Sequence, residues 1–166
     1  MAGTPTVDEV AEFMRQQGLT LVTAESCTAG LIAATLADVK GAGKLLDCAF
    51  VTYSPEAKQR CLGVRQETID RFNLTSEAVA REMALGALRL SPANLAVANT
   101  GVTDGTDPDI PAGTQCYAWA FEPGQAGGEP RVFSETCRFD GDRNAIRQAS
   151  ADYALGRIPE LAARRA

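Results

Sequence analysis

The chain has 166 residues, 45% of them hydrophobic, a formal net charge of −5 at pH 7 and no histidine. This length predicts one domain, residues 1–166, around one core, and the negative charge argues against a general nucleic-acid binder because it repels a phosphate backbone. Without histidine, Ser-His-Asp and Cys-His catalysis are excluded, so any acyl-transfer chemistry must take its base from lysine, tyrosine or a carboxylate.

The first predicted elements are a helix, a strand and a second helix. The start of the chain lacks the basic region and apolar stretch of a secretion signal, and no run of 18 or more apolar residues follows, so we expect a cytoplasmic protein that is not bound to a membrane. The segment 6–9, Thr-Val-Asp-Glu, predicts a capping box that opens a helix ending near Gly18. Residues 19–23 are apolar and β-branched and predict a buried strand, and residues 28–37 have the apolar spacing of a helix.

Residues 25–30, Glu-Ser-Cys-Thr-Ala-Gly, fall at the junction of that strand and that helix. Free amide donors at the start of the helix would point back at these hydroxyl and thiol groups, which suits an oxyanion or a phosphate. A capping role for Ser26 is the simpler interpretation. Spacing alone does not decide between the two.

A second polar cluster follows the second predicted strand, residues 48–53. Residues 54–56, Ser-Pro-Glu, supply an N-cap, a proline at the first helical position and an acid in the first turn, so the helix that follows carries Lys58. Ser54 and Lys58 then lie on the same helical face at the strand end. Partial burial would lower the pKa of this lysine by the roughly three units that a base near neutrality needs. An ordinary exposed lysine is the alternative.

The rest of the chain completes an α/β arrangement. The predicted elements are helices at 66–72 and 76–90, a strand at 95–99, a loop at 100–113, a hairpin of strands at 115–121 and 131–139, and a final helix from Asp142 towards Leu161. Helices that alternate with buried strands favour a three-layer α/β/α sandwich with a mixed, largely parallel sheet. Ligands bind beyond the carboxyl ends of the strands in such sheets, which is where the polar clusters are expected.

The loop at 100–113 is the third polar cluster. Its glycines and hydroxyls fit a ligand-contacting loop, since a backbone without Cβ atoms lets a ligand approach closely. Asp104, Asp107 and Asp109 also allow a calcium or magnesium site, but oxygen-rich turns of this kind are more often plain turns, and we predict no metal. The sequence has neither a G-x-G-x-x-G nor a Walker lysine loop, and its five scattered cysteines are expected to be reduced.

Four segments of the sequence resemble signature segments of one known family, the CinA C-terminal domain. They are residues 23–30 (Thr-Ala-Glu-Ser-Cys-Thr-Ala-Gly), 50–58 (Phe-Val-Thr-Tyr-Ser-Pro-Glu-Ala-Lys), 96–102 and 138–143, in the family's order, and the likeness covers nearly the whole chain. This resemblance implies an α/β/α fold similar to anticodon-binding domains. It also implies a hydrolase for a small pyridine nucleotide, because stand-alone members include deamidases that convert nicotinamide mononucleotide to nicotinate mononucleotide and ammonia. No metal or cofactor is implied, and a homodimer is expected because members of the family commonly form one.

Carried onto this chain, the resemblance assigns catalytic roles to Ser26, Tyr53 and Lys58. The candidate substrate-binding residues, from resemblance and position together, are Glu25, Thr28, Ala29, Gly30, Ser54, Thr100, Gly101 and Arg143. In the mechanism that this implies, Lys58, assisted by Tyr53, takes the proton from Ser26, whose oxygen attacks the carboxamide carbon. Amide donors at the start of the helix predicted at 28–37 would hold the oxyanion, and water would then hydrolyse the acyl-enzyme.

Two further hypotheses stay open. Residues 103–109 carry three carboxylates where the family typically has a glycine-rich sequence, and carboxylates repel a phosphate. In the second hypothesis the chain is therefore a catalytically silent or re-purposed member that binds a nucleotide or a cationic small molecule without hydrolysing it. In the third hypothesis Cys27 is the nucleophile, although without histidine its thiolate would depend on the helix dipole and Lys58. For the homodimer, the alanine-rich faces of the helix at 76–90 and of the final helix are the expected surfaces.

Overall fold

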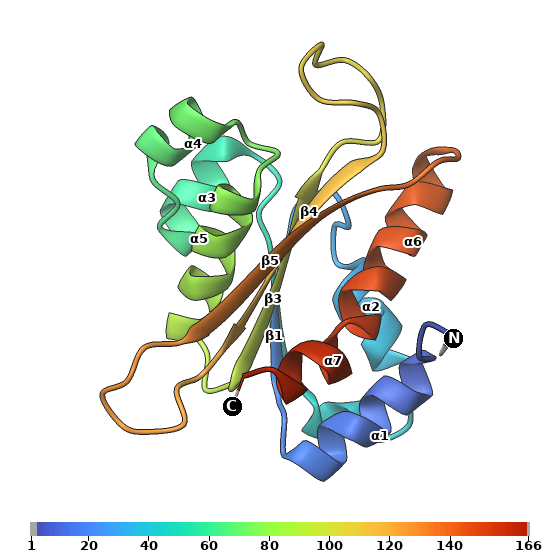
Figure 1. Ribbon diagram of the computed structural model, residues 1–166, viewed down its shortest axis with the longest axis vertical. Helices are drawn as coiled ribbons and strands as arrows, with labels where there is room; N and C mark the ends of the chain where they lie inside the picture. Colours follow the sequence, from blue (N-terminus) through green and yellow to red (C-terminus); the bar gives the residue numbers. More distant parts are fainter. Residues whose placement is uncertain (1–2, 166) are drawn as a thin grey trace.

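A sheet of five strands lies between two layers of helices in the computed structural model, which describes residues 3–165 (Figure 1). The elements are, in chain order, α1 (Val7–Gln17), β1 (Leu21–Glu25), α2 (Leu31–Ala37), the 3-10 turn η1 (Ala42–Lys44), β2 (Leu46–Val51), α3 (Pro55–Leu62), α4 (Gln66–Phe72), α5 (Glu77–Arg89), β3 (Leu95–Gly101), β4 (Thr114–Phe121), β5 (Arg131–Arg138), α6 (Arg143–Gly156) and α7 (Ile158–Ala163). The strand order is β2-β1-β3-β4-β5. β1 runs parallel to β2 and β3, whereas β4 is antiparallel to both of its neighbours. The predicted α/β/α sandwich with a mixed sheet is confirmed.

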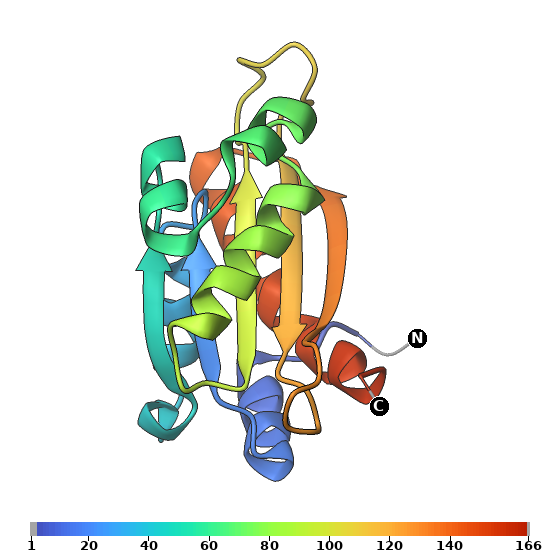
Figure 2. The ribbon, with the colours of Figure 1, turned by 90° about the vertical axis from the view of Figure 1, so that its left-hand side faces the viewer.

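The two faces of the sheet are covered by different helices. α1, α2, α6 and α7 pack on one face, and α3, α4 and α5 lie on the other (Figures 1 and 2). Large side chains such as Tyr117 and Trp119 fill the first face, whereas alanines line the second, where α5 packs through alanines of its own such as Ala80. Alanines of α6, among them Ala154, are buried as well. These alanine-rich faces are therefore used inside the monomer, and their predicted role as dimer surfaces is wrong. The homodimer itself stays a prediction.

The first strand is shifted by two residues from its predicted position at 19–23. Asn94 is the cause, because its side-chain oxygen accepts the Thr20 amide at 2.9 Å while its own amide donates to the Thr20 hydroxyl at 3.3 Å. The Thr20 amide is thus bonded to a side chain instead of a neighbouring strand. The regular backbone hydrogen bonds of β1 therefore begin at Leu21. As a consequence Glu25 is the last residue of β1, and Ser26 is the first residue after it.

Three helix starts follow the capping predictions. Thr6 and Glu9 form the reciprocal capping box of α1. Ser54 caps α3 and Asp142 caps α6, each by accepting the amide of the residue three positions later. None of the helices in residues 3–165 combines the length and the apolar composition of a membrane-spanning segment.

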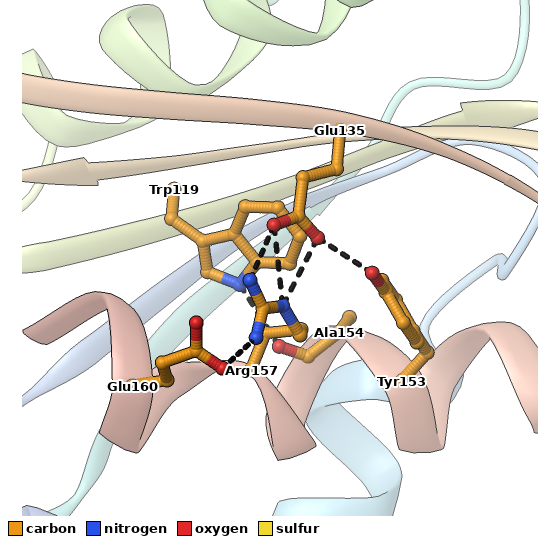
Figure 3. A network of polar contacts seen from close by, with 6 residues as sticks. All are labelled: Trp119, Glu135, Tyr153, Ala154, Arg157 and Glu160. Carbon is orange, nitrogen blue, oxygen red and sulfur yellow. Dashed lines mark hydrogen bonds and ion pairs between the residues drawn. The ribbon is translucent and has the colours of Figure 1, made fainter.

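The C-terminal helical segment is broken, against the prediction of one helix reaching Leu161. α6 ends and α7 begins around Arg157, because Pro159 has no N–H to continue the hydrogen bonds of α6 but fits the first turn of a new helix. At this break Arg157 donates to the Glu135 carboxylate on β5, which also accepts the Tyr153 hydroxyl at 2.6 Å (Figure 3). Burial raises the pKa of Glu135, but the bonds from Arg157 and Tyr153 outweigh it and lower the pKa below its ordinary value. The ionised carboxylate therefore fastens α6 to the sheet, and α6 in turn reaches the candidate site.

Candidate functional site

A cavity of about 240 Å³ opens at the carboxyl ends of β1, β2 and β3. Five residues predicted from the sequence line it together: Ser26, Tyr53, Lys58, Thr100 and Gly101. The fold thus brings the three polar clusters of the sequence to one place, as expected for neighbouring parallel strands. A larger cavity of about 510 Å³ lies between the start of α1 and α6, but none of its lining residues, all in the described part of the chain, is a serine, cysteine or lysine. The smaller cavity is therefore the candidate active site.

Ser26 and Lys58 are in direct hydrogen-bond contact. The Lys58 Nζ atom lies 2.9 Å from Ser26 Oγ, 2.8 Å from the Thr52 carbonyl oxygen and 3.2 Å from the Tyr53 carbonyl oxygen. The two carbonyls can only accept, so they take two of the amine's N–H groups and leave its remaining tetrahedral position for Ser26. In the neutral amine that position is a lone pair, which can accept the Ser26 hydroxyl proton.

The surroundings of Lys58 favour the neutral amine. Its side chain is 2% exposed, and burial lowers its pKa from the ordinary 10.5 to about 8. No carboxylate in residues 3–165 lies within ion-pair distance of Nζ to oppose this shift. About one tenth of the lysine is then neutral at pH 7, against less than about one in a thousand for an exposed lysine. The prediction that Lys58 is buried enough to serve as a base is supported, and the ordinary exposed lysine is ruled out.

The Ser26 side chain is presented by a tight turn, not by the entrance of a helix as predicted. Ala29 has φ +48° and Gly30 has φ +97°, and two consecutive left-handed residues cannot continue into a right-handed helix. The helix predicted at 28–37 therefore begins only at Leu31. The turn is closed by the Ala29 amide, which donates to the Ser26 carbonyl at 3.0 Å. Ser26 is consequently not a helix cap, and its hydroxyl is left for Lys58.

The Glu25 carboxylate occupies the helix start that was predicted to bind an oxyanion. Its buried carboxylate accepts the amides of Gly30, Ile32 and Ala33 at 2.8–3.1 Å, and also the hydroxyls of Thr23 and Thr28. The amide donors of α2 are thereby satisfied by the protein itself. Two predictions are corrected by this arrangement: Glu25 is not exposed to a substrate, and the start of α2 does not hold the oxyanion.

Replacement of Glu25 by glutamine is expected to lower the free energy of unfolding by about 1–3 kcal/mol. The glutamine amide nitrogen is best placed where it faces the Thr23 hydroxyl, which can rotate to accept. In that position it also meets the Ala33 amide, so two donors face each other in a buried site. Urea denaturation measures the change, and the exposed Glu129→Gln variant should stay within about 0.5 kcal/mol of the parent. Equal stability of the two variants would show that the five hydrogen bonds of Glu25 are not a stabilising unit.

Two residues that the sequence analysis missed hold the turn in place. Arg147 of α6 donates to the carbonyls of Cys27 and Thr28 at 2.9 and 3.3 Å, and the Asn99 side chain on β3 accepts the Thr28 amide at 3.1 Å. Arg147 lies one helical turn after Arg143 on the same face of α6, and this spacing is the signal that could have identified it. The turn that carries Ser26 is therefore fixed from two elements distant in sequence.

Several candidate substrate-binding residues lie outside the cavity. Thr28 is fully buried and bonded to Glu25, Ala29 is exposed, Gly30 lies near Val51, and none of the three lines the cavity. Ser54 is engaged in capping α3. These residues shape the site through the backbone and are not positioned as ligands.

Tyr53 lines the cavity in a different way than predicted. Its side chain is 61% exposed, and its hydroxyl has no hydrogen bond to Ser26 or Lys58 among the described residues. The group that contacts Lys58 is the Tyr53 backbone carbonyl. The main chain of Tyr53, and not its hydroxyl, therefore contacts the candidate base.

Six further residues line the cavity. Cys27 is the alternative nucleophile, and Val102 and Asp107 belong to the loop predicted to contact a ligand, whereas Asn73, Leu74 and Thr75 were not predicted. The segment between α4 and α5 reaches the cavity through tertiary contacts, such as the bond from the Thr100 hydroxyl to the Leu74 carbonyl at 3.0 Å. No local pattern in the sequence marks such a contact.

The three aspartates of the loop that follows β3 have separate partners. Asp104 pairs with Arg143 at 3.1 Å, and both side chains are more than half exposed. Arg143, a predicted substrate-binding residue, does not line the cavity. Asp107 accepts the Asn73 side-chain amide and the Asp109 backbone amide, each at 2.9 Å. Residues 3–165 contain no group of three or more metal-ligating side chains.

Known proteins that resemble this chain in sequence and in structure carry the CinA C-terminal domain or belong to the CinA superfamily. The model of the CinA C-terminal domain family matches residues 4–162. The chain is 38% identical over 150 residues to the nicotinamide-nucleotide amidohydrolase PncC of Escherichia coli K12, covering 89% of this chain and 87% of that protein. It is 40% identical over 156 residues to a CinA-like protein of Akkermansia muciniphila, covering 93% of this chain, but it spans only 36% of the length of that relative and of another from Symbiobacterium thermophilum. A crystal structure of a CinA superfamily protein from Klebsiella pneumoniae superposes with a TM-score of 0.87 at 35% identity, over 95% of this chain and 96% of the other.

Proposed function

Because the chain belongs to the CinA C-terminal domain family, we propose that it is an amidohydrolase that converts nicotinamide mononucleotide to nicotinate mononucleotide and ammonia. One observation carries the proposal: a buried lysine amine, with its pKa lowered to about 8, lies 2.9 Å from a serine hydroxyl at the wall of a cavity. In a chain without histidine this pair supplies both a nucleophile and a base. The amidohydrolase name of the E. coli relative supports the substrate class.

The first half of the proposed reaction forms an acyl-enzyme. The neutral amine of Lys58 accepts the Ser26 proton while Oγ bonds to the carboxamide carbon, which leaves an ammonium on Lys58 and an oxyanion on the substrate. When the tetrahedral intermediate collapses, the C–N bond breaks and Lys58 returns the proton to the departing nitrogen, which leaves as ammonia. Ser26 is then esterified by the nicotinoyl group, and Lys58 is neutral again.

The second half repeats these roles with water. Lys58 accepts a proton from water as its oxygen attacks the ester carbon, and the proton then passes to Ser26 Oγ as the ester bond breaks. The product acid then loses its remaining proton to solvent water and leaves as a carboxylate. Each half-reaction returns the amine to its starting state, so no cofactor is needed.

The backbone amide of Cys27 is assigned as the oxyanion donor in place of the start of α2. It belongs to the residue directly after the nucleophile, on the cavity wall, and it has no hydrogen-bond partner among the residues that the structure describes. An unpaired donor next to the attacking oxygen stabilises negative charge on the substrate oxygen. The neighbouring Thr28 amide is already bonded to Asn99 and is not free for this role.

The direct test is incubation of the purified protein with nicotinamide mononucleotide. We expect equimolar release of ammonia and nicotinate mononucleotide, because one amide bond is hydrolysed per turnover. An enzymatic ammonia assay and chromatography of the nucleotides measure the two products. If the nucleotide raises the melting temperature but no ammonia appears, the protein is a binding member of the family, and the proposed hydrolysis is refuted.

A further inference from the structure

One carboxylate lies in the wall of the candidate cavity, on the loop that rises above the sheet between α4 and α6 (Figures 1 and 2). Asp107 shares the cavity with Ser26 and Lys58. The mechanism proposed above does not use it. Its neighbour on the loop, Asp104, is paired with Arg143, whereas Asp107 has no cationic partner within 4 Å among the described residues. The Asp107 carboxylate is thus not paired with a cationic side chain.

Two uncharged hydrogen-bond donors fix the position of the Asp107 carboxylate and favour its ionised form. The Asn73 side-chain amide and the Asp109 backbone amide bond to different oxygens of the carboxylate, at 2.9 Å each. These bonds lower the pKa of Asp107 below its ordinary value, with the bond from Asn73 as the main cause. Each oxygen keeps a further lone pair, so the carboxylate can still accept from a ligand or lie against a cation.

Asn73 is itself fixed, which makes the carboxylate a preset feature of the cavity. It has φ +77°, a left-handed value that is uncommon outside glycine. Its side-chain oxygen accepts the Thr75 amide at 3.1 Å while its nitrogen donates to Asp107. The same side chain therefore stabilises the turn between α4 and α5 and fixes the loop residue that lines the cavity together with Ser26.

The size of the cavity determines which part of a nucleotide Asp107 can meet. The carboxamide carbon must reach Ser26 Oγ, so the ring that bears it has to enter the cavity. At about 240 Å³ the cavity is smaller than the roughly 300–1,000 Å³ of most ligand pockets. It can enclose the ring and its amide, and the ribose and phosphate then extend towards solvent. Lys58 must be neutral to accept the Ser26 proton. In that state Asp107 is the charged side chain among those that line the cavity.

We propose that Asp107 is the counter-ion for a positively charged aromatic ring, so that the cavity selects N-substituted pyridinium amides over neutral pyridine amides. This proposal rests on the proposed function, because it takes the substrate to be an amide of the nicotinamide class. It adds that the site distinguishes substrates by the charge of the ring. The charge on a pyridinium ring is attracted to the carboxylate, whereas a neutral ring of the same shape gains nothing from it. The same carboxylate disfavours a phosphate inside the cavity, which agrees with the phosphate lying outside.

The test compares two ligands that differ by ring charge, in a variant that cannot hydrolyse them. 1-Methylnicotinamide, which is methylated at the ring nitrogen, is a permanent cation, and nicotinamide is neutral. Their dissociation constants are measured by NMR titration with the Ser26→Ala protein at pH 9, where Lys58 is mostly neutral because its pKa is about 8. We expect the cation to bind about tenfold more tightly or better, and we expect Asp107→Asn in the same background to remove this preference.

Asp109→Asn is the matched control. It removes the same charge from the same loop, but its side chain is exposed and does not line the cavity, so the preference for the cation should persist. Equal binding of the two ligands before Asp107 is changed, a preference that survives Asp107→Asn, or no binding of the cation would each overturn the proposal.

The outcomes separate this inference from the proposed function. Ammonia release by the parent protein without any ring-charge preference leaves the amidohydrolase in place and removes the role of Asp107. A charge preference that depends on Asp107, together with no ammonia release, keeps the inference and removes the hydrolysis. The binding experiment uses no turnover, so neither result can be mistaken for the other.

Discussion

Ser26→Ala is expected to lower the rate of ammonia release from nicotinamide mononucleotide by about 10⁴-fold or more, because it removes the atom that forms the acyl-enzyme in the proposed mechanism. The fold should be retained. In the described part of the chain the Ser26 hydroxyl is bonded to Lys58 Nζ alone, and Nζ keeps its two carbonyl acceptors in the variant. The free energy of unfolding should therefore change by no more than about 1–2 kcal/mol. Steady-state ammonia assays and urea denaturation on the same preparation measure both quantities.

Cys27→Ala is the matched control for this result, because it removes the other candidate nucleophile from the same turn. Burial raises the pKa of the Cys27 thiol, so it stays protonated at neutral pH. The Gln115 side chain that lies 3.5 Å from its sulfur is a donor and cannot take its proton. The alanine variant keeps the backbone N–H assigned to the oxyanion, so activity should stay within about tenfold of the parent. An active Ser26→Ala protein beside an inactive Cys27→Ala protein would transfer the nucleophilic role to the thiol.

The contact between Ser26 and Lys58 could be predicted because the position of each residue follows from local sequence signals and from the topology of the sheet. The apolar stretch before Ser26 and the strand before Tyr53 read as neighbouring strands, and parallel strands bring their carboxyl ends together. The Ser-Pro-Glu start of α3 fixed the phase of the helix that carries Lys58. A lysine on the first turn after such a strand points back over the strand end, which is where it is found.

The features that could not be predicted depend on backbone angles and long-range contacts. No pattern in the sequence indicates the hydrogen-bond partners of Glu25, because its bonds to the amides at the start of α2 form only when Ala29 and Gly30 adopt left-handed backbone angles. Alanine has a high helix propensity, so a helix start before Ala29 is predicted, whereas α2 begins at Leu31. The contact of Asn73 with Asp107 joins residues 34 positions apart on two irregular segments, where neither periodicity nor a motif applies.

The second large effect is expected at Lys58. If its neutral amine is the base, kcat/KM should rise with pH and level off above about 8, the pKa to which burial lowers this lysine. Lys58→Met keeps an unbranched side chain of similar length but has no proton acceptor, and it should lose about 10²- to 10⁴-fold in kcat. The measurement is a pH profile of kcat/KM from about pH 6 to about pH 9 for the parent, with single rates for the variant. A parent profile that is flat across pH 8 would contradict the assignment of the base.

The same burial also makes the stability of the protein depend on pH, with a sign that follows from the two pKa values of Lys58. The amine titrates near 10.5 in the unfolded chain and near 8 in the folded one, so between these values the unfolded chain binds more protons. The free energy of unfolding should therefore rise from pH 8 to pH 10.5 by about 3 kcal/mol on account of Lys58, and this contribution is lost as the pH falls through 8. Buried Cys116 and Tyr117, whose pKa values are raised by burial, act in the opposite direction in this window, but they do so equally in Lys58→Met. The difference in stability between parent and variant isolates the lysine for this reason, and a difference that stays constant with pH would mean that water reaches Nζ and that the amine is not poised to accept a proton from Ser26.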